Sequence, residues 1–561
     1  MQDSHNLSHI TNLSYFHNPG SKPLNYLTIG NVFETAAEKY GQTEAIVSVY
    51  DNRRITYEEL LHDADKLAAG LQCLGIGKGE RIGLWAPNII EWVTVFYAAS
   101  RLGLITVTLN PTYEATELNY CLNKCGVKAL VCSDVYKTLD FYGKLCTLLP
   151  ELATSGDIVA SNTVPTLTTI IVISQTKLRG TYNYYDVLGM VDDISIKKIR
   201  ENQTNISPDD ICNIQFSSGT TGFPKATCLT HFQIVNNAFE CGKRFQMNSD
   251  EFKICLQVPL FHVFGLVSCV ALSPQFGITM VLPSPTYNST ANLNALEQEK
   301  CSIAFGTPTM YLDLINVQRQ LNKKIFVTKA VVSGALCPPS TIKSMKEIFQ
   351  IKHVLIGYGA TELTCCAFQA LVDDNEYQKT ETVGYIGDYI EAKVVDNNGK
   401  IVPFGTPGEL CVRGYLTMAG YWDDPERTNE AFYNGKWYRT GDQFILQEDG
   451  YARIVGRVKD MIIRGGENIF PKEIEEVLSS HPDILEVSII GMKSERLGEE
   501  VCACVRVKPG SNLTLDSLKV FCKGKIANYK IPSHLKVMDT FPKTTSGKTQ
   551  KFLLKQQIDT N

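Results

Sequence analysis

The chain has 561 residues, of which 44% are hydrophobic and 20% charged, as in an ordinary globular protein. Because a single hydrophobic core rarely extends beyond about 250–300 residues, this length predicts more than one domain. With 54 basic and 59 acidic residues the formal net charge is −5, which argues against a protein that binds nucleic acid through bulk positive charge.

The cysteines and the chain ends carry neither a zinc-site pattern nor a recognisable targeting signal. The 18 cysteines have no regular spacing, and the close pairs Cys121/Cys125 and Cys502/Cys504 lack the C-x2-C spacing typical of zinc ligands. We therefore expect reduced thiols in an intracellular compartment. The N-terminus has no apolar signal core, and the C-terminal QQIDTN is not a peroxisomal address.

The first part of the chain alternates predicted helices with short apolar strands. Thr56 and Glu59 form a capping box before a predicted amphipathic helix that ends at Gly75. The segments RIGLWAP, VKALVCS and LTTIIVIS are short and apolar, as buried strands are. This alternation predicts an α/β fold with largely parallel sheets.

A long stretch from Ile254 to Leu296 contains no Lys, Arg, Asp or Glu. Prolines and glutamines interrupt it, so it offers no clean run of about 20 apolar residues that could cross a bilayer. We interpret it as a buried segment beside a ligand channel, and we expect no transmembrane segment.

The last hundred residues have a different pattern. Pro471 in NIFPKEIEEVLSSHP stands at a plausible first position of a helix. The segment EVCACVRVK alternates two sets of side chains, which predicts a half-exposed strand. A small α+β module is therefore expected after the large α/β part.

The segment QFSSGTTGFPK combines hydroxyl groups, glycines and one lysine. Phosphate oxygens need closely spaced donors, which glycine backbone permits and Ser and Thr hydroxyls supplement. A Walker P-loop is excluded, because Pro224 precedes the lysine and Ala226 follows it. A Ser/Gly-rich surface loop remains an alternative on composition alone. The candidate phosphate-binding residues are Ser217, Ser218, Gly219, Thr220, Thr221, Gly222, Phe223, Pro224 and Lys225.

Five ordered motifs give this segment a more specific interpretation. The motifs are SSGTTGFPK, GYGATELT (Gly357 to Thr364), WYRTGD (Trp437 to Asp442), GRVKDMIIRGGENIFPKEIE (Gly456 to Glu475) and PKTTSGKTQK (Pro542 to Lys551). In this order they resemble the adenylate-forming superfamily of acyl-CoA synthetases, peptide-synthetase adenylation domains and firefly-type luciferases. The resemblance extends from about residue 30 to the end of the chain.

Within the superfamily, THFQIVNN, VPLFHVFG and LTIGNVFETAAEKYG are most similar to medium-chain acyl-CoA ligases of the acyl-CoA synthetase family member 2 type. One departure is Ala226, where the family usually has glycine. The resemblance implies a large domain of layered α/β sheets with a small β-barrel-like part and a small mobile α+β lid. The implied boundaries are 1–456 for the adenylation domain, 457–460 for the hinge and 461–561 for the lid.

The resemblance also implies the roles of individual residues in ATP binding. Residues 217–225 would hold the β- and γ-phosphates, and Thr361 would bind the α-phosphate. Glu362 would hold Mg²⁺, a cation that prefers oxygen ligands. Asp442 would accept hydrogen bonds from the ribose hydroxyls, with Arg457 beside it. Adenine would lie between the Tyr358 ring and backbone that includes Gly334 and Ala335.

Two further residues would act on the acid. Lys548 would contact the carboxylate and the α-phosphate and stabilise charge while the acyl–phosphate bond forms. His262 would lie where the carboxylate meets the acyl channel, but a satisfied core histidine is an equally good interpretation. For the second half-reaction the lid would rotate about Lys459. Coenzyme A would then pass the lid strand that carries Arg464, Gly465 and Gly466.

The predicted function is an ATP-dependent fatty acid–CoA ligase that uses ATP, Mg²⁺ and coenzyme A, with medium-chain acids expected. An adenylating enzyme for an aryl acid, a luciferase-like enzyme and a catalytically decayed nucleotide-binding protein remain alternatives. We expect no nucleic-acid partner, and the sequence identifies no protein partner. The resemblance implies a mitochondrial location, although the N-terminus lacks the pattern of a presequence, and the cytoplasm is the alternative.

Overall fold

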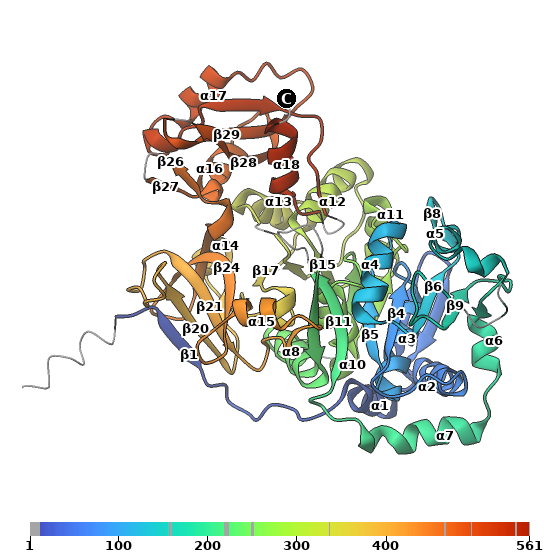
Figure 1. The fold of residues 1–561 in the computed structure, drawn as a ribbon. Coiled ribbons are helices and arrows are strands. Elements are labelled where there is room, and N and C mark those ends of the chain that lie inside the picture. The colour runs from blue at the N-terminus through green and yellow to red at the C-terminus, as the bar shows by residue number, and fades with distance from the viewer. Residues whose placement is uncertain are drawn as a thin grey trace, which may run out of the picture.

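The computed structural model describes residues 12–154, 156, 160–217, 224–247, 252–335, 337–464, 467–494, 496–544 and 547–559. Two large sheets and the helices around them form the body of the molecule (Figure 1). The first sheet has the order β10 (Tyr182–Asn183), β9 (Thr169–Ile173), β6 (Ala129–Ser133), β4 (Arg81–Trp85), β5 (Ile105–Thr108), β11 (Ile211–Ser217), β12 (Lys225–Thr230) and β22 (Gly420–Tyr421). Its strands pair in parallel from β10 to β11, and β12 and β22 are antiparallel.

The second sheet is also parallel in its centre. Its order is β19 (Tyr385–Ile386), β18 (Phe368–Gln369), β17 (His353–Tyr358), β16 (Lys329–Val332), β15 (Ile303–Gly306), β13 (Lys253–Leu256), β14 (Thr279–Leu282), β2 (Glu44–Ser48) and β3 (Arg53–Thr56). The strands from β17 to β2 pair in parallel, whereas β3, β18 and β19 are antiparallel.

Helices cover both faces of each sheet. Four helices share one core with the inner faces of the two sheets: α1 (Ile29–Tyr40), α2 (Tyr57–Cys73), α3 (Ile90–Leu102) and α8 (His231–Arg244). The outer face of the first sheet packs on α4 (Ala115–Cys125) and α5 (Phe141–Leu148). The outer face of the second packs on α11 (Ser289–Gln298), α12 (Pro308–Leu321) and α13 (Pro339–Phe349). These layers confirm the predicted α/β fold.

Local sequence signals account for the ends of these helices. At the start of α2 the Thr56 hydroxyl accepts from the backbone N–H of Glu59 at 3.3 Å, and the Glu59 carboxylate accepts from the backbone N–H of Thr56 at 2.8 Å. Just beyond its end, Gly75 has a φ of +77°, a conformation that glycine adopts without a steric penalty. The predicted capping box and helix stop are therefore confirmed.

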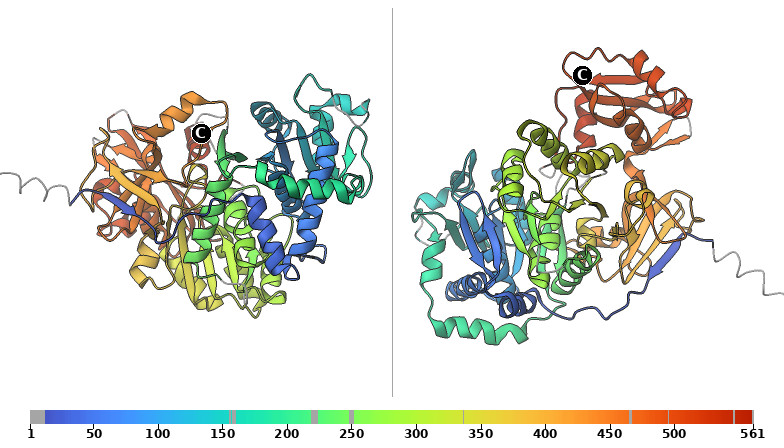
Figure 2. Two further views of the ribbon diagram at one scale, coloured as in Figure 1. Left: turned by 90° about the horizontal axis from the view of Figure 1, so that it is seen from below. Right: turned by 180° about the vertical axis from the view of Figure 1, so that it is seen from behind.

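A third, antiparallel sheet lies beside the two large ones. Its order is β1 (Tyr15–Asn18), β20 (Ile390–Val395), β21 (Gly408–Gly414), β24 (Trp437–Leu446) and β23 (Phe432–Tyr433), with β25 (Ala452–Arg457) paired to β24. From β1 the chain runs in extended form along the body to α1 (Figure 2). Among the described strands the order of this sheet does not close on itself, so the expected barrel-like part is an open antiparallel sheet.

Several short elements complete the body. They are β7 (Val135–Tyr136), β8 (Leu139–Asp140), α6 (Tyr184–Gly189), α7 (Asp193–Glu201), α9 (Val263–Gly265), α10 (Ser273–Phe276), α14 (Glu376–Glu381) and α15 (Pro425–Ala431). Between α9 and α10 lies a π-helical turn, η3 (Leu266–Val270). Most of the uncharged stretch from 254 to 296 is buried, as predicted. No helix among the described residues has the length and apolar run needed to cross a bilayer.

The C-terminal part, which we call the lid, has a sheet and cores of its own. Its strands are β26 (Ile462–Arg464), β27 (Glu467–Ile469), β28 (Ile484–Ser494), β29 (Gly498–Val507) and β30 (His534–Val537). Its helices are α16 (Pro471–Ser479), α17 (Leu515–Cys522) and α18 (Lys551–Asp559). The short turn η5 (Val458–Asp460) joins it to β25 of the body (Figure 1). The three domain boundaries given above stay a prediction.

One strand of the lid differs from its prediction. The middle of β29, from Val501 to Val505, is buried on both faces, so the half-exposed strand predicted there is wrong. Cys502 and Cys504 pack under α18, while Val501 and Val505 belong to the core on the opposite face of the sheet. A cysteine packs as a small apolar residue, so the face that carries Cys502 and Cys504 can be buried as well as the opposite one.

Candidate active site

The candidate site lies where the ends of several strands meet the lid. Ser217 is the last residue of β11, and Lys225 is the first residue of β12. Thr361 and Glu362 lie in the short turn η4 (Thr361–Leu363), which follows β17. Asp442 belongs to β24 of the third sheet. In open parallel sheets ligands bind beyond the carboxyl ends of the strands, which is where β11 and β17 bring these residues together.

A first cluster surrounds the carboxylate of Glu362. The hydroxyls of Ser217 and Tyr421 both donate to Glu362 Oε1, at 2.9 and 3.0 Å. Lys225 Nζ donates to the Tyr421 hydroxyl at 3.4 Å and lies 5.0 Å from the centre of its ring. Burial and then the negative charge of Glu362 raise the pKa of Tyr421, so its hydroxyl remains protonated. Thr361 precedes Glu362 in the same turn and is buried with it.

A second cluster surrounds the carboxylate of Asp442. The Tyr358 hydroxyl donates to Asp442 Oδ2 at 2.7 Å, and Arg457 Nε lies 3.1 Å from Asp442 Oδ1. Burial, followed by the charge of Asp442, raises the pKa of Tyr358 well above its usual range. The Ser333 hydroxyl donates to the carbonyl oxygen of Gly357 at 2.9 Å. The segment that contains Gly334 and Ala335 therefore lies beside the strand end that carries Tyr358.

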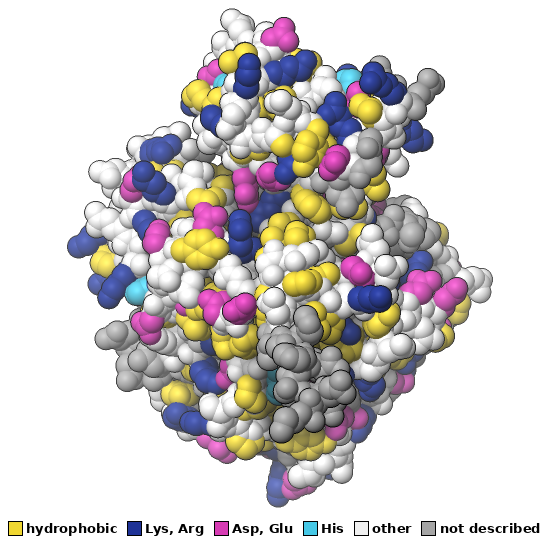
Figure 3. All heavy atoms as spheres, turned by 90° about the vertical axis from the view of Figure 1, so that its left-hand side faces the viewer, with side chains coloured by type: hydrophobic (Ala, Val, Ile, Leu, Met, Phe, Trp, Pro, Cys, Tyr) yellow, Lys and Arg dark blue, Asp and Glu magenta, His cyan; other side chains and the backbone are white. Residues whose placement is uncertain are grey.

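Lys548 reaches the site from the lid on a tight turn. Its backbone N–H donates to the Thr544 hydroxyl at 3.1 Å, and its carbonyl accepts from the Thr544 N–H at 2.8 Å. Gly547 has a φ of +82°, and a methyl group added there would lie 3.7 Å from the Thr307 hydroxyl oxygen of the body. The turn therefore stands close against the start of α12, and Figure 3 shows charged side chains of both signs where the lid meets the body.

The pKa of Lys548 depends on the charges of other predicted site residues. Burial and then the positive charge of Arg457 lower the pKa of Lys548 to about 8, and Asp442 acts in the opposite direction. Burial and the charge of Lys548 in turn lower the pKa of His262 to about 4. The ammonium group of the lid is thus within electrostatic range of the Asp442 cluster and of His262.

His262 has a structural partner as well as this location. Its Nδ1 accepts from the backbone N–H of Phe264 at 3.2 Å, which caps the short helix α9. With its low pKa the ring is neutral at pH 7. The two interpretations of His262 are therefore compatible, since one ring nitrogen caps α9 and the ring also lies within electrostatic range of Lys548.

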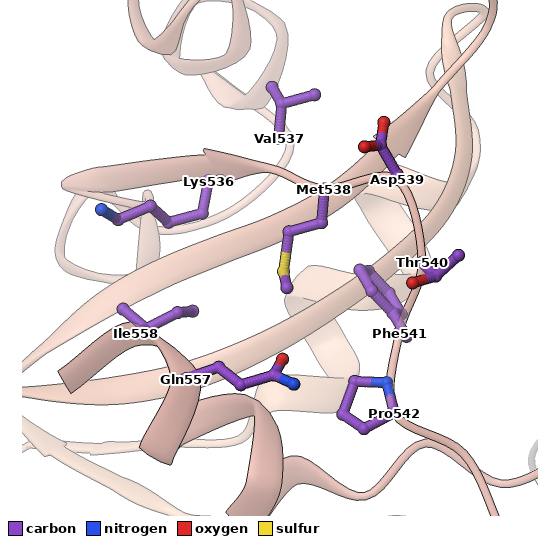
Figure 4. A pocket seen from close by; sticks show the side chains of 9 residues that line it. All are labelled: Lys536, Val537, Met538, Asp539, Thr540, Phe541, Pro542, Gln557 and Ile558. Carbon is purple, nitrogen blue, oxygen red and sulfur yellow. The ribbon is translucent and has the colours of Figure 1, made fainter. Parts of the chain in front are cut away.

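The predicted hinge and coenzyme A residues are only partly brought to the site. Lys459 lies in η5, and its pKa is lowered by burial and then by Arg457. Arg464 donates to the carbonyl oxygen of Tyr529 at 2.7 Å, so it is held within the lid. A groove of about 650 Å³ on the lid, beside β30 and α18, contains none of these residues (Figure 4).

Comparison with known proteins identifies the family. The family model described as AMP-binding enzyme matches residues 33–422, and that of the AMP-binding enzyme C-terminal domain matches residues 473–548. The chain belongs to the AMP-binding enzyme family. It is 41% identical to the medium-chain acyl-CoA ligase ACSF2, mitochondrial, of Danio rerio, over 97% of this chain and 91% of that protein.

Two solved structures show the same fold. A fatty acyl CoA synthetase of Mycobacterium tuberculosis is 26% identical with a TM-score of 0.70, covering 95% of this chain and 98% of that one. The anthranilate CoA ligase AuaEII, in complex with anthranoyl-AMP, is 24% identical with a TM-score of 0.82, covering 96% of this chain and 98% of that one. These matches confirm the adenylate-forming fold expected from the sequence motifs.

Part of the predicted site lies outside the described residues. Of the predicted ATP-binding residues these are Ser218, Gly219, Thr220, Thr221, Gly222 and Phe223, and of the predicted coenzyme A-binding residues they are Gly465 and Gly466. Pro224 is described, and its carbonyl oxygen accepts from the Tyr120 hydroxyl at 3.2 Å. The roles assigned to all these residues stay predictions.

Two features of the site were not evident from the sequence. Tyr421 was missed, because none of the five motifs contains it and only its position in space brings it to Glu362. The departure at Ala226 is also explained, since its methyl group packs in the core with Cys228 on the outer face of the first sheet. Because side chains alternate along a strand, this face is opposite to that of Lys225.

Proposed function

We propose that this protein is an ATP-dependent acid–thiol ligase that converts medium-chain fatty acids into acyl-CoA through an acyl-adenylate. The observation that carries the proposal is that the lid turn with Lys548 stands against the start of α12 and buries the ammonium group within electrostatic range of Arg457, Asp442 and His262. A cation on the lid is thus within electrostatic range of the proposed ribose-binding carboxylate and of His262 in the uncharged segment.

In the first half-reaction a carboxylate oxygen attacks the α-phosphorus of ATP, and pyrophosphate leaves. Two anions must approach each other, so the site has to supply positive charge and oriented donors. Lys225 and the hydroxyl of Ser217 would contact the β- and γ-phosphates, and Thr361 the α-phosphate. Lys548 would lie between the attacking carboxylate and the α-phosphate and neutralise the charge that they share.

Nucleotide binding would use the Asp442 cluster. Each carboxylate oxygen has two lone pairs, so Asp442 can accept from the ribose hydroxyls while it keeps Tyr358 and Arg457 as partners. Adenine would stack on the Tyr358 ring, beside the backbone of Gly334 and Ala335. The ring is fixed by an edge contact with Phe444, with centroids 4.6 Å apart.

Glu362 would hold the Mg²⁺ that accompanies ATP. Its buried carboxylate, with the Ser217 hydroxyl beside it, supplies the oxygen ligands that Mg²⁺ prefers. Among the described residues no three or more His, Cys, Asp or Glu side chains gather into a metal site. A cation held by one carboxylate, by phosphate oxygens and by water fits this donor set. When bound, it would neutralise charge on the phosphates.

In the second half-reaction the coenzyme A thiolate attacks the acyl carbon and AMP leaves. Because Lys548 is buried within electrostatic range of Asp442 and His262 here, we expect that the lid moves before a thiol enters. Rotation about Lys459 would bring the strand with Arg464, Gly465 and Gly466 to the acyl carbon. A mitochondrial location is part of the proposal, because the similar ligase of Danio rerio is named as mitochondrial.

The experiment is an acid-dependent exchange of labelled pyrophosphate into ATP, with short, medium and long straight-chain acids and benzoate compared. We expect exchange to be highest with medium-chain acids, and acyl-CoA to form when coenzyme A is added. Highest exchange with benzoate would favour an aryl-acid ligase instead. A lack of exchange with every acid would contradict the proposal. A C-terminal fluorescent fusion would test the location.

A further inference from the structure

Tyr421 lies between two parts of the site, and no step proposed above uses it. It ends the short strand β22, which pairs with β12 so that Tyr421 stands opposite Thr227. Its side chain is buried, with 6% of the residue exposed. A buried tyrosine hydroxyl normally has a hydrogen-bond partner, and this one has two charged partners, Lys225 and Glu362, with the Tyr438 side chain also beside it.

The chemistry of the two partners fixes the direction of each hydrogen bond. A lysine ammonium group can only donate, and an ionised carboxylate can only accept. The Tyr421 hydroxyl therefore accepts from Lys225 Nζ at 3.4 Å and donates to Glu362 Oε1 at 3.0 Å. The hydroxyl links the lysine of the phosphate loop to the proposed metal-binding carboxylate.

Backbone hydrogen bonds fix the segment that carries Tyr421. The N–H of Tyr421 donates to the Thr428 hydroxyl at 2.9 Å, and the N–H of Trp422 donates to the carbonyl of Ala226 at 2.8 Å. The N–H of Met418 donates to the carbonyl of Glu362 itself at 2.9 Å. The segment is thus tied both to β12 and to the turn that carries Glu362.

We propose that Tyr421 is a positioning residue that fixes the Glu362 carboxylate for the cation of the nucleotide and holds Lys225 nearby until a triphosphate takes it. This inference rests on the proposed function. The contact with Lys225 is long and its ammonium can exchange partners, whereas Ser217 and Tyr421 together hold one oxygen of Glu362 at short range. A preformed carboxylate lowers the cost of ordering the site when the metal–nucleotide complex binds.

The test compares Tyr421→Phe with Tyr433→Phe. Both changes remove one hydroxyl, but Tyr433 is 38% exposed on β23, where it pairs with Trp437 and has Lys393 over its ring. Equilibrium binding of ATP is measured by calorimetry across a Mg²⁺ titration and in EDTA. We expect Tyr421→Phe to weaken binding of the Mg²⁺ complex about tenfold and to change metal-free binding little, as for loss of a hydrogen bond to a charged group. Tyr433→Phe should match the unmodified protein.

A second measurement separates positioning through Glu362 from a general loss of packing. The same titration is made with Glu362→Gln and with the double variant Tyr421→Phe/Glu362→Gln. If Tyr421 acts through Glu362, its substitution has little further effect on the Mg²⁺ dependence in the Glu362→Gln protein. Equal and additive effects, or a Tyr421→Phe protein with the Mg²⁺ dependence of Tyr433→Phe, would overturn the inference.

The two proposals can fail separately. Pyrophosphate exchange by the unmodified protein tests the ligase, whereas the calorimetric titration needs no acid. If the unmodified protein shows acid-dependent exchange but Tyr421→Phe leaves the Mg²⁺ titration unchanged, only the proposed role of Tyr421 is rejected. An altered titration without exchange by any acid would retain that role in nucleotide binding and reject the ligase.

Discussion

The hydroxyl of Tyr358 donates a hydrogen bond of 2.7 Å to Oδ2 of Asp442, so the aromatic residue of one motif orients the carboxylate of another. Tyr358→Phe keeps the ring and removes this donor. We predict that the KM for ATP rises about fivefold, because losing one hydrogen bond costs about 1 kcal/mol. The kcat should change little, since the contact lies in the proposed ribose site. Steady-state kinetics at saturating acid check this, and an unchanged KM would mean that Arg457 alone orients Asp442.

Substitution of Lys548 separates the two half-reactions. Lys548→Ala removes the cation from the site, and we predict that acyl-adenylate formation falls by about a hundredfold or more. Thioester formation from supplied acyl-adenylate and coenzyme A should remain, because Lys548 has no part in it. Single-turnover assays of each half-reaction measure both. Equal losses in the two would indicate that Lys548 supports the fold of the lid instead.

The pKa of Lys548, lowered to about 8, predicts a pH dependence for the free protein. The protonated ammonium is the active form, so kcat/KM for ATP should fall as the pH rises through about 8. Lys548→Arg should remove this fall, because a guanidinium stays charged in that range. The pH profiles of pyrophosphate exchange are measured for the unmodified protein and for Lys548→Arg. If both lose activity over the same alkaline range, a group other than Lys548 causes the fall.

For the proposed hinge residue, Lys459, we predict the opposite pattern of losses to that of Lys548→Ala. Lys459 lies in η5, between the last strand of the body and the first strand of the lid. Lys459→Pro fixes φ there, which restricts rotation of the lid. Since Lys548 is already buried near Arg457 and Asp442, we predict that adenylate formation is kept and thioester formation is lost. If both half-reactions are retained, the lid does not rotate about Lys459.

A buried carboxylate in the body predicts a large effect on stability. Asp65 pairs with the buried Arg101, and Arg200 Nε lies 2.9 Å from its Oδ2. Asp65→Ala leaves these charges without their main partner, and we predict a loss of about 3–5 kcal/mol. Lys197→Ala breaks an exposed pair with Glu201, 3.7 Å long, and should cost less than about 0.5 kcal/mol. Thermal unfolding of the two variants tests the contrast.

Much of the fold could be predicted because its signals are local. The capping box of Thr56 and Glu59 and the first-turn Pro471 depend on neighbours within one helical turn, and both are present as predicted. The strand around Cys502 and Cys504 is present as predicted, but its exposure was predicted wrongly, because exposure depends on whether a distant helix covers the strand. A cysteine in the amino-acid sequence does not indicate whether the face of the strand that carries it is covered.

The sequence by itself determined the order of the motifs and the chemical groups that they contain, including Lys225, Glu362, Asp442 and Lys548. Only the tertiary structure decided their electrostatic state and their partners. The lowered pKa of Lys548 and the link from Lys225 through Tyr421 to Glu362 depend on burial and on charges from distant segments. Such interactions fall off with distance in space and not along the chain, so no spacing of residues in a sequence can encode them.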